Sequence, residues 1–139
     1  MLKTNEEDDV DKMENTFSIT NKTKGKLPRL PFLEMKESVL GKKYDLSLVF
    51  IGTTRSRTLT NTYRKKDKAS NVLSFPIDKD SGEIFITPIV AKKEAKKFGK
   101  SPNQHIGFLF IHGLLHLKGY LHGSKMESKE KALSKRFGV

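Results

Sequence analysis

Hydrophobic and polar residues alternate in four short segments of the chain, and this alternation predicts four β-strands. The segments are "FSITN" (17–21), "YDLSLVFIG" (44–52), "ASNVLSFPI" (69–77) and "GEIFIT" (82–87). They are rich in β-branched and aromatic residues, and Gly52 and Pro76 mark the ends of two of them.

Apolar residues recur at helical spacing in five other segments, which predict five helices. We expect them at about 29–40, at 88–98, from Pro102 until Gly119 breaks the helix, and at 124–137, with a short helix capped by Thr53 or Thr54 on which Leu59 and Tyr63 share a face. The helix that begins at Pro102 is apolar nearly all round, which is typical of a buried central helix. Strands and helices in this mixed order predict an α+β or α/β fold.

A chain of 139 residues is the size of one domain. Residues 1–14 carry six acids against two lysines and have almost no apolar content, so we expect an acidic disordered tail there and a single domain over 15–139.

No stretch approaches the roughly 20 apolar residues of a membrane span, and the acidic start is unlike a signal or transit peptide. The absence of cysteine is compatible with a reducing compartment. We therefore expect a soluble, cytoplasmic protein.

Positive charge is concentrated in the body of the chain. The formal net charge is +11, made of −4 over residues 1–14 and +15 over the remainder, which has 25 basic and 10 acidic residues. A body this basic attracts polyanions and favours nucleic acid as a partner. The alternative is a soluble protein from a lysine-rich proteome.

Three of the four histidines fall in "IHGLLHLKGYLHG". His112 and His116 lie one turn apart on one helix face, and Gly119 allows the chain to reverse and bring His122 over the same face. Three imidazoles with one open position are typical of a catalytic zinc site. Nickel, copper and iron remain open, and the alternative is three ordinary histidines on a buried helix. His105 lies roughly 10 Å from His112 along the helix axis, which is too far for both to bind the same ion. We therefore expect His105 to be a residue at the helix start or on the surface.

The histidine spacing H-x-x-x-H-x-x-G-x-x-H matches the metzincin proteases. Those proteases carry a glutamate after the first histidine as the general base, whereas this chain has Gly113. Glycine has no side chain to move a proton, so the site lacks the general base of these proteases. The positive charge of the chain indicates a phosphate substrate instead.

A second segment, "NTYRKKDKASNVLSFP", is strongly basic. Arginine offers a planar fork to a phosphate and lysine a point charge. The predicted substrate-binding residues are Arg55, Arg57, Lys66 and Lys68. For the individual lysines the alternative is a solvated turn. Arg64 differs, because we expect its neighbour Tyr63 to pack inward and fix its position.

These segments resemble the YbeY endoribonuclease family. The family pattern H-G-x-L-H-L-x-G-Y-D-H matches "HGLLHLKGYLH", Y-R-G-K-D-x-x-T-[DN]-V-L-S-F-P matches "YRKKDKASNVLSFP", and G-[DE]-I-x-I matches "GEIFI". The resemblance covers roughly residues 17–137 in the same order and spacing. Three differences stand out: Leu121 replaces an aspartate, Lys65 replaces a glycine, and the acidic tail is extra.

The resemblance implies a mixed, mostly parallel four-stranded sheet flanked by about five helices, with a zincin-like metal helix at the centre. It implies one zinc ion per chain on His112, His116 and His122, and places Arg64 in the substrate cleft. The implied function is metal-dependent cleavage of single-stranded RNA in ribosomal RNA maturation and ribosome quality control, with the small ribosomal subunit as partner.

In this interpretation the metal acts as a Lewis acid or activates water, and Arg64 stabilises charge on the phosphate. Glu83 is a candidate proton-transfer group, and four lysines of the 88–98 helix could follow an RNA backbone: Lys92, Lys93, Lys96 and Lys97. Leucine at position 121 removes a hydrogen-bond acceptor beside His122 and predicts a slow nuclease. The alternatives are a non-enzymatic RNA-binding ribosome-assembly factor with a structural metal, which Leu121 favours, and a small metallopeptidase, which Gly113 disfavours.

Overall fold

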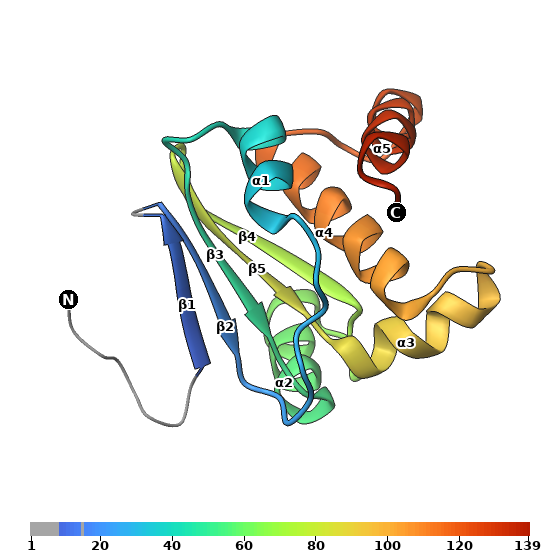
Figure 1. The fold of residues 1–139 in the computed structure, drawn as a ribbon. Coiled ribbons are helices and arrows are strands. Elements are labelled where there is room, and N and C mark those ends of the chain that lie inside the picture. The colour runs from blue at the N-terminus through green and yellow to red at the C-terminus, as the bar shows by residue number, and fades with distance from the viewer. Residues whose placement is uncertain (1–8, 15) are drawn as a thin grey trace.

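The computed structural model describes residues 9–14 and 16–139, and it forms one mixed sheet with five helices (Figure 1). The strands are β1 (Asp9–Glu14), β2 (Phe17–Asn21), β3 (Asp45–Phe50), β4 (Val72–Asp78) and β5 (Ser81–Ile86). The helices are α1 (Phe32–Leu40), α2 (Thr53–Arg64), α3 (Pro88–Lys97), α4 (Pro102–Lys118) and α5 (Ser124–Phe137).

The strand order in the sheet is β1-β2-β3-β5-β4. β2 pairs in parallel with β3, and β3 with β5, whereas β4 runs antiparallel to β5 at one edge. The four strands predicted from the alternation are therefore present, and two of their three pairings are parallel. The predicted α+β fold with a mixed, mostly parallel core sheet is confirmed.

Strand β1 adds a fifth strand at the other edge of the sheet, antiparallel to β2. It lies within the segment 1–14 that was predicted to be a disordered tail, so for Asp9–Glu14 that prediction is wrong. An antiparallel edge strand is held by backbone hydrogen bonds and tolerates charged side chains, so it needs no apolar pattern. The remainder of the predicted tail, 1–8, lies outside the described residues.

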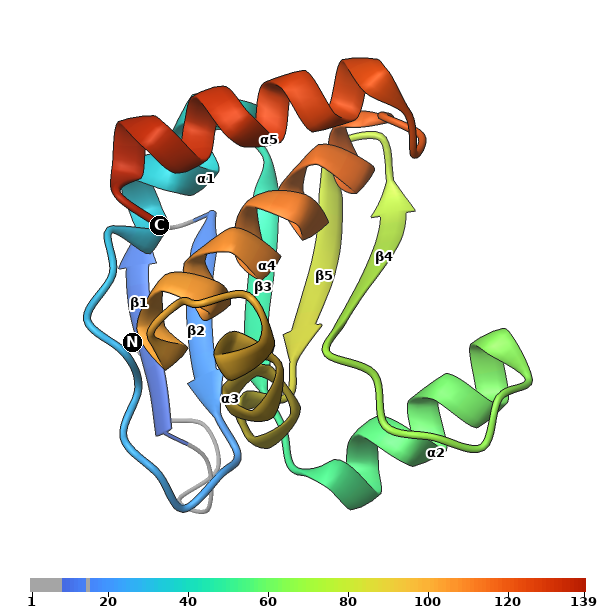
Figure 2. The same cartoon turned by 90° about the vertical axis from the view of Figure 1, so that its right-hand side faces the viewer.

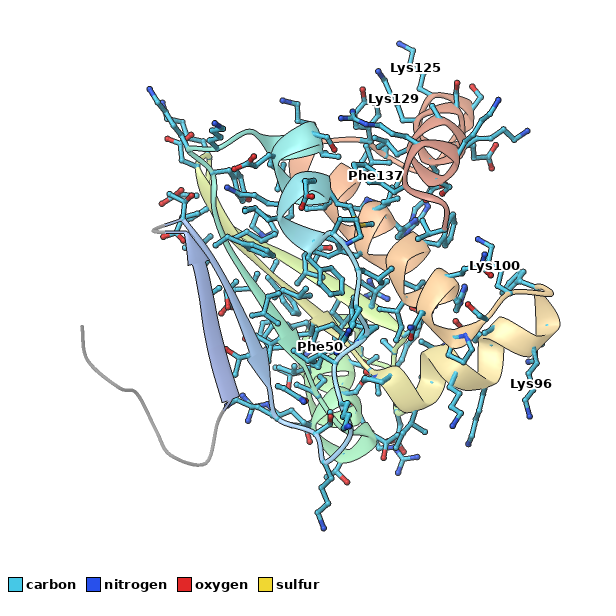
Figure 3. All side chains as sticks on the ribbon, viewed as in Figure 1. Phe50, Lys96, Lys100, Lys125, Lys129 and Phe137 are labelled. Carbon is cyan, nitrogen blue, oxygen red and sulfur yellow. The ribbon has the colours of Figure 1, made fainter. Side chains whose placement is uncertain are left out.

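Helices α1, α3, α4 and α5 all lie on one side of the sheet, with α4 crossing the middle of that side (Figures 1 and 2). The core between them is formed by buried side chains such as Leu48, Phe50, Ile84, Phe110 and Leu114. Figure 3 shows Phe50 in this layer and Lys125 and Lys129 on the outer side of α5. Among the described residues no helix covers the opposite side of the sheet, and α2 lies beyond the β4 edge (Figure 2).

Helix α4 is delimited as the sequence predicts. Ser101 caps its start in a reciprocal pair of hydrogen bonds with Gln104, and Gly119 ends it in the left-handed conformation, with φ of 111°. Within the described part of the chain, no helix is both long and apolar enough to cross a membrane.

Gly113 brings α4 unusually close to the sheet. A Cβ atom at this position would lie 2.9 Å from Ser74 Oγ and 3.1 Å from Ile84 Cδ1. The Ser74 hydroxyl also donates a hydrogen bond of 3.1 Å to the Gly113 carbonyl. The contact therefore depends on the missing side chain, and it sets the distance between α4 and β4.

Candidate metal centre and cleft

The three predicted metal ligands come together at the end of α4. His112 and His116 lie on the last turns of the helix, and His122 follows in the loop after Gly119. One nitrogen from each ring lies within 4.8 Å of the other two, and the Nε2 atoms of His112 and His116 are 3.1 Å apart. The left-handed turn at Gly119 produces this arrangement, as the spacing of the three residues predicts.

The outer nitrogens of two rings are held by hydrogen bonds. His112 Nδ1 donates to the Glu130 carboxylate at 2.5 Å, and His116 Nδ1 donates to the Tyr120 carbonyl at 3.1 Å. Such partners fix the tautomer and leave Nε2 free to bind a metal, which is the usual environment of metal-binding histidines. The donor set and its hydrogen bonds therefore fit a zinc ion.

The pKa of His116 is lowered, mainly because burial disfavours the imidazolium and secondly because His112 is adjacent. The hydrogen bond to the Tyr120 carbonyl acts in the opposite direction. The net effect favours the neutral ring, which is the form that binds a metal.

Glu130 is a residue of the site that the sequence analysis missed. Its side chain is only 12% exposed, and it lies on α5, which packs along α4 (Figure 2). A signal was present: Met126, Glu130, Leu133 and Phe137 recur at helical spacing, so the acid interrupts the apolar stripe of an otherwise amphipathic helix.

The histidines form one wall of a cleft of about 360 Å³. The other residues around it are Arg64, Asn71, Val72 and Ser74. The structure thus brings Arg64, from the end of α2, into the same cleft as the three histidines. Asn71 and Ser74 belong to the segment singled out in the sequence, but neither was predicted as a site residue.

The other predicted substrate-binding residues lie outside this cleft. Arg55, Arg57, Lys66 and Lys68 are exposed on α2 and on the loop after it, and Arg57 approaches Asp67 at 3.6 Å. The four lysines of α3 (Lys92, Lys93, Lys96 and Lys97) are likewise exposed.

Two expectations about single residues are wrong. Tyr63 does not pack inward: it is 63% exposed, and its ring lies against the Phe75 ring, with 4.9 Å between the centroids. Glu83 does not face the cleft. Ile84 points toward α4 and is fully buried, and because side chains alternate along a strand, Glu83 points to the opposite face of the sheet.

His105 is a helix-start residue, as expected, but it is not on the surface. Only 3% of it is exposed, because its ring lies between Phe98 and Phe108, with centroids 5.3 and 6.1 Å away. Its Nε2 is 3.0 Å from Glu94, whose carboxylate also accepts a hydrogen bond of 2.9 Å from the Asn71 amide. His105 therefore supports the cleft residue Asn71 through Glu94.

Comparison with known proteins agrees with this geometry. The family model described as "Endoribonuclease YbeY" matches residues 8–138. The chain belongs to the YbeY family. Curated proteins named Endoribonuclease YbeY are similar to it: one from Campylobacter jejuni (strain 81-176) is 38% identical, covering 78% of this chain and 86% of that protein. One from Staphylococcus carnosus is 29% identical, covering 87% of each.

A solved structure gives the same result for the fold. The solution structure of TM1509 from Thermotoga maritima is similar with a TM-score of 0.57 and 25% sequence identity, covering 75% of this chain and 74% of that one. The YbeY family match begins at residue 8, so β1 lies within it. The view that all residues before Phe17 are an addition to the family is therefore wrong for β1.

Two residues, Lys65 and Leu121, differ from the YbeY pattern, and the structure shows the environment of each. Lys65 follows α2 in the left-handed conformation, with φ of 58°, which is the conformation that glycine adopts most easily. Leu121 lies in the loop before His122 and is 83% exposed. The hydrogen bonds that His112 and His116 donate to Glu130 and to the Tyr120 carbonyl show that two of the three rings are oriented without an acid at position 121.

Proposed function

We propose that the protein is a metal-dependent endoribonuclease that hydrolyses single-stranded RNA in ribosomal RNA maturation and ribosome quality control. We propose further that it acts in the cytoplasm and on the small ribosomal subunit. One observation supports the chemistry above all others: three imidazole ligands and one arginine line the same cleft of about 360 Å³.

His112, His116 and His122 would hold one zinc ion per chain. The ligands are all nitrogen, which suits zinc, and three protein ligands leave the fourth position open for a reactant. A zinc ion bound there supplies a Lewis acid to a phosphoryl oxygen. The role of Glu130 and of the Tyr120 carbonyl is to keep two of the rings in the ligand tautomer.

Arg64 would bind the phosphate and stabilise its charge in the transition state. The seven residues around the cleft include neither a lysine nor a carboxylate, so Arg64 is the sole permanent cation among them. A guanidinium donates two parallel hydrogen bonds to a phosphate. It therefore orients the scissile phosphodiester beside the three histidines and opposes the charge that develops on it.

The structure disfavours the two alternative functions for different reasons. A structural zinc site is usually closed by four ligands, whereas the three histidines lie open to the cleft and His122 is exposed. A metallopeptidase with this histidine spacing would need a glutamate at position 113 as its general base, and at that position even a Cβ atom would lie 2.9 Å from Ser74 Oγ.

Cleavage of a labelled single-stranded RNA by the zinc-loaded protein tests the proposal. We expect cleavage that a chelator abolishes, and a loss of about 10²- to 10³-fold in kcat for Arg64→Ala. Arg64→Lys should recover only part of this loss, because lysine cannot make the bidentate contact. RNA binding without cleavage in every metal-loaded preparation would support a non-enzymatic assembly factor instead.

A further inference from the structure

Three aromatic side chains form a cluster on the side of the sheet away from the metal centre. The ring centroid of Phe75 on β4 is 4.9 Å from that of Tyr63 on α2 and 5.7 Å from that of Phe85 on β5. Phe85 pairs with Leu73 in the sheet, one position from the inward-facing Ile84 and Ile86. By strand alternation Phe75 and Phe85 therefore lie on the face of the sheet opposite α1, α3, α4 and α5 (Figure 1).

The outermost ring of the cluster is open to solvent. Tyr63 is 63% exposed, although aromatic residues usually bury most of their area. Phe75 and Phe85 are half-buried beneath it. The Tyr63 ring meets the Phe75 ring at an interplanar angle of 57° and Tyr63 stays mostly exposed, so the three rings can serve as a stacking platform.

This platform adjoins the cleft. Tyr63 and Arg64 are consecutive at the end of α2, and consecutive helical residues point about 100° apart. Arg64 therefore lines the cleft while Tyr63 contacts Phe75 around the β4 edge. A strand of nucleic acid whose phosphate is bound by Arg64 passes the Tyr63 ring with its next nucleotides.

The surrounding charge favours a polyanion. Residues 53–68 contain six basic residues and one acid, a net charge of +5. The basic side chains of this segment are exposed, as are both partners of the Arg57–Asp67 contact. Exposed aromatic rings beside basic residues are how proteins bind single-stranded nucleic acid, because bases stack on the rings while cations follow the backbone.

We propose that Tyr63, supported by Phe75 and Phe85, is a base-stacking subsite for the single-stranded RNA that flanks the cleaved phosphodiester. This inference rests on the proposed function and extends it. RNA leaves the cleft at Arg64, crosses the β4 edge and stacks a base on Tyr63. The subsite selects unpaired RNA, since a base inside a duplex has no free face to offer.

Cleavage kinetics of Tyr63→Ala on a short single-stranded RNA test the subsite. We expect KM to rise about 5- to 150-fold, the range for loss of one stacked base, with kcat nearly unchanged because the ring binds substrate and transition state alike. Tyr63→Phe should stay within about twofold of the wild type, because the ring is kept. Ile89→Ala, which removes an apolar side chain that is 53% exposed on α3, on the helix side of the sheet, is the control and should not change KM.

An RNA with one abasic position beside the scissile bond distinguishes stacking from general damage. Loss of the base and loss of the ring remove the same contact, so their effects on KM should not add. The salt dependence should also be the same in Tyr63→Ala and wild type, because the ring neutralises no phosphate. Fully additive effects, or an unchanged KM in a Tyr63→Ala protein that cleaves RNA, would overturn the subsite and leave the nuclease intact.

Two other outcomes are equally decisive. If the wild-type protein cleaves no RNA, the proposed function is wrong. The subsite is then tested by the RNA affinities of wild type and Tyr63→Ala, measured by fluorescence anisotropy, which should again differ by about 5- to 150-fold. If Tyr63→Ala leaves RNA affinity unchanged but alters the sedimentation of the protein, the aromatic face binds another copy of the chain and the subsite is wrong.

Discussion

At the scale of single residues, Glu130 and the three histidines form the candidate metal centre. The histidine cluster could be predicted because a four-residue spacing and a glycine stop depend only on local geometry. Glu130 contacts His112 across 18 residues of sequence, so its role depends on how α5 packs on α4. The exposure of Tyr63 was predicted wrongly, because it depends on which other elements pack against the end of α2 and not on the local sequence.

Replacing Glu130 should weaken metal binding. Glu130→Gln keeps the size of the side chain but removes the charge that holds His112 in the ligand tautomer, and losses of this kind lower metal affinity about 10- to 100-fold. Competition with a chromogenic chelator measures the affinity. Glu127→Gln, on the exposed side of the same helix, is the matched control and should have no effect. Equal affinities in both variants would contradict this role of Glu130.

The Leu121→Asp variant tests the remaining ring. His112 and His116 already have hydrogen-bond partners, whereas no hydrogen bond among the described residues reaches His122. An aspartate at the exposed position 121 can serve only that ring, so we expect a gain of about tenfold in metal affinity or cleavage, the lower end of the usual range. An unchanged affinity and rate would show that packing alone orients His122.

At the scale of secondary structure, most elements follow from hydrophobic periodicity. Among the described residues, all five helices and four of the five strands lie close to the segments predicted for them, since alternation and helical spacing report directly on which face is buried. Strand β1 has neither pattern, because its order comes from backbone pairing with β2 at the sheet edge. The uncovered face of the sheet and the position of α2 beyond β4 depend on tertiary packing, which the periodicity does not encode.

The close approach of α4 to the sheet predicts a cost for any side chain at position 113. In Gly113→Ala the new Cβ would meet Ser74 and Ile84 at 2.9 and 3.1 Å, and overpacking of this kind costs about 1–3 kcal/mol. Urea unfolding measures the difference. Gly25→Ala, in a loop, is the control, because the nearest atom to a Cβ there lies 4.0 Å away. Equal stability of both variants and the wild type would show that α4 can move away from the sheet freely.

At the scale of the whole molecule, the positive charge lies in the body of the chain and a small acidic segment lies at its start. The chain carries +15 after residue 14 and −4 before it, and the segment 53–68 lies beside the metal cleft. The excess of charge was evident from composition alone. The position of this charge relative to the histidines could not be predicted from composition, because only the folded chain brings Arg64 close to them.

RNA affinity should therefore fall steeply with salt. The expected log–log slope is about −0.7 for each phosphate neutralised, measured by fluorescence anisotropy with single-stranded RNA. Deleting residues 1–8 removes three acids and one lysine, a net charge of −2, and leaves β1 in place. We expect slightly tighter binding by this variant. An affinity that is independent of salt would contradict electrostatic binding.

The central claim is that three histidines hold one metal ion that RNA cleavage requires, and a zinc titration of metal-free protein tests it most directly. Single-stranded RNA cleavage is measured as zinc is added to wild-type protein and to His116→Ala. We predict that wild-type activity rises linearly and stops rising at about one zinc per chain, the stoichiometry of a site with three protein ligands, while His116→Ala stays inactive throughout. Full cleavage by the metal-free protein, or the same titration curve for His116→Ala, would contradict the claim.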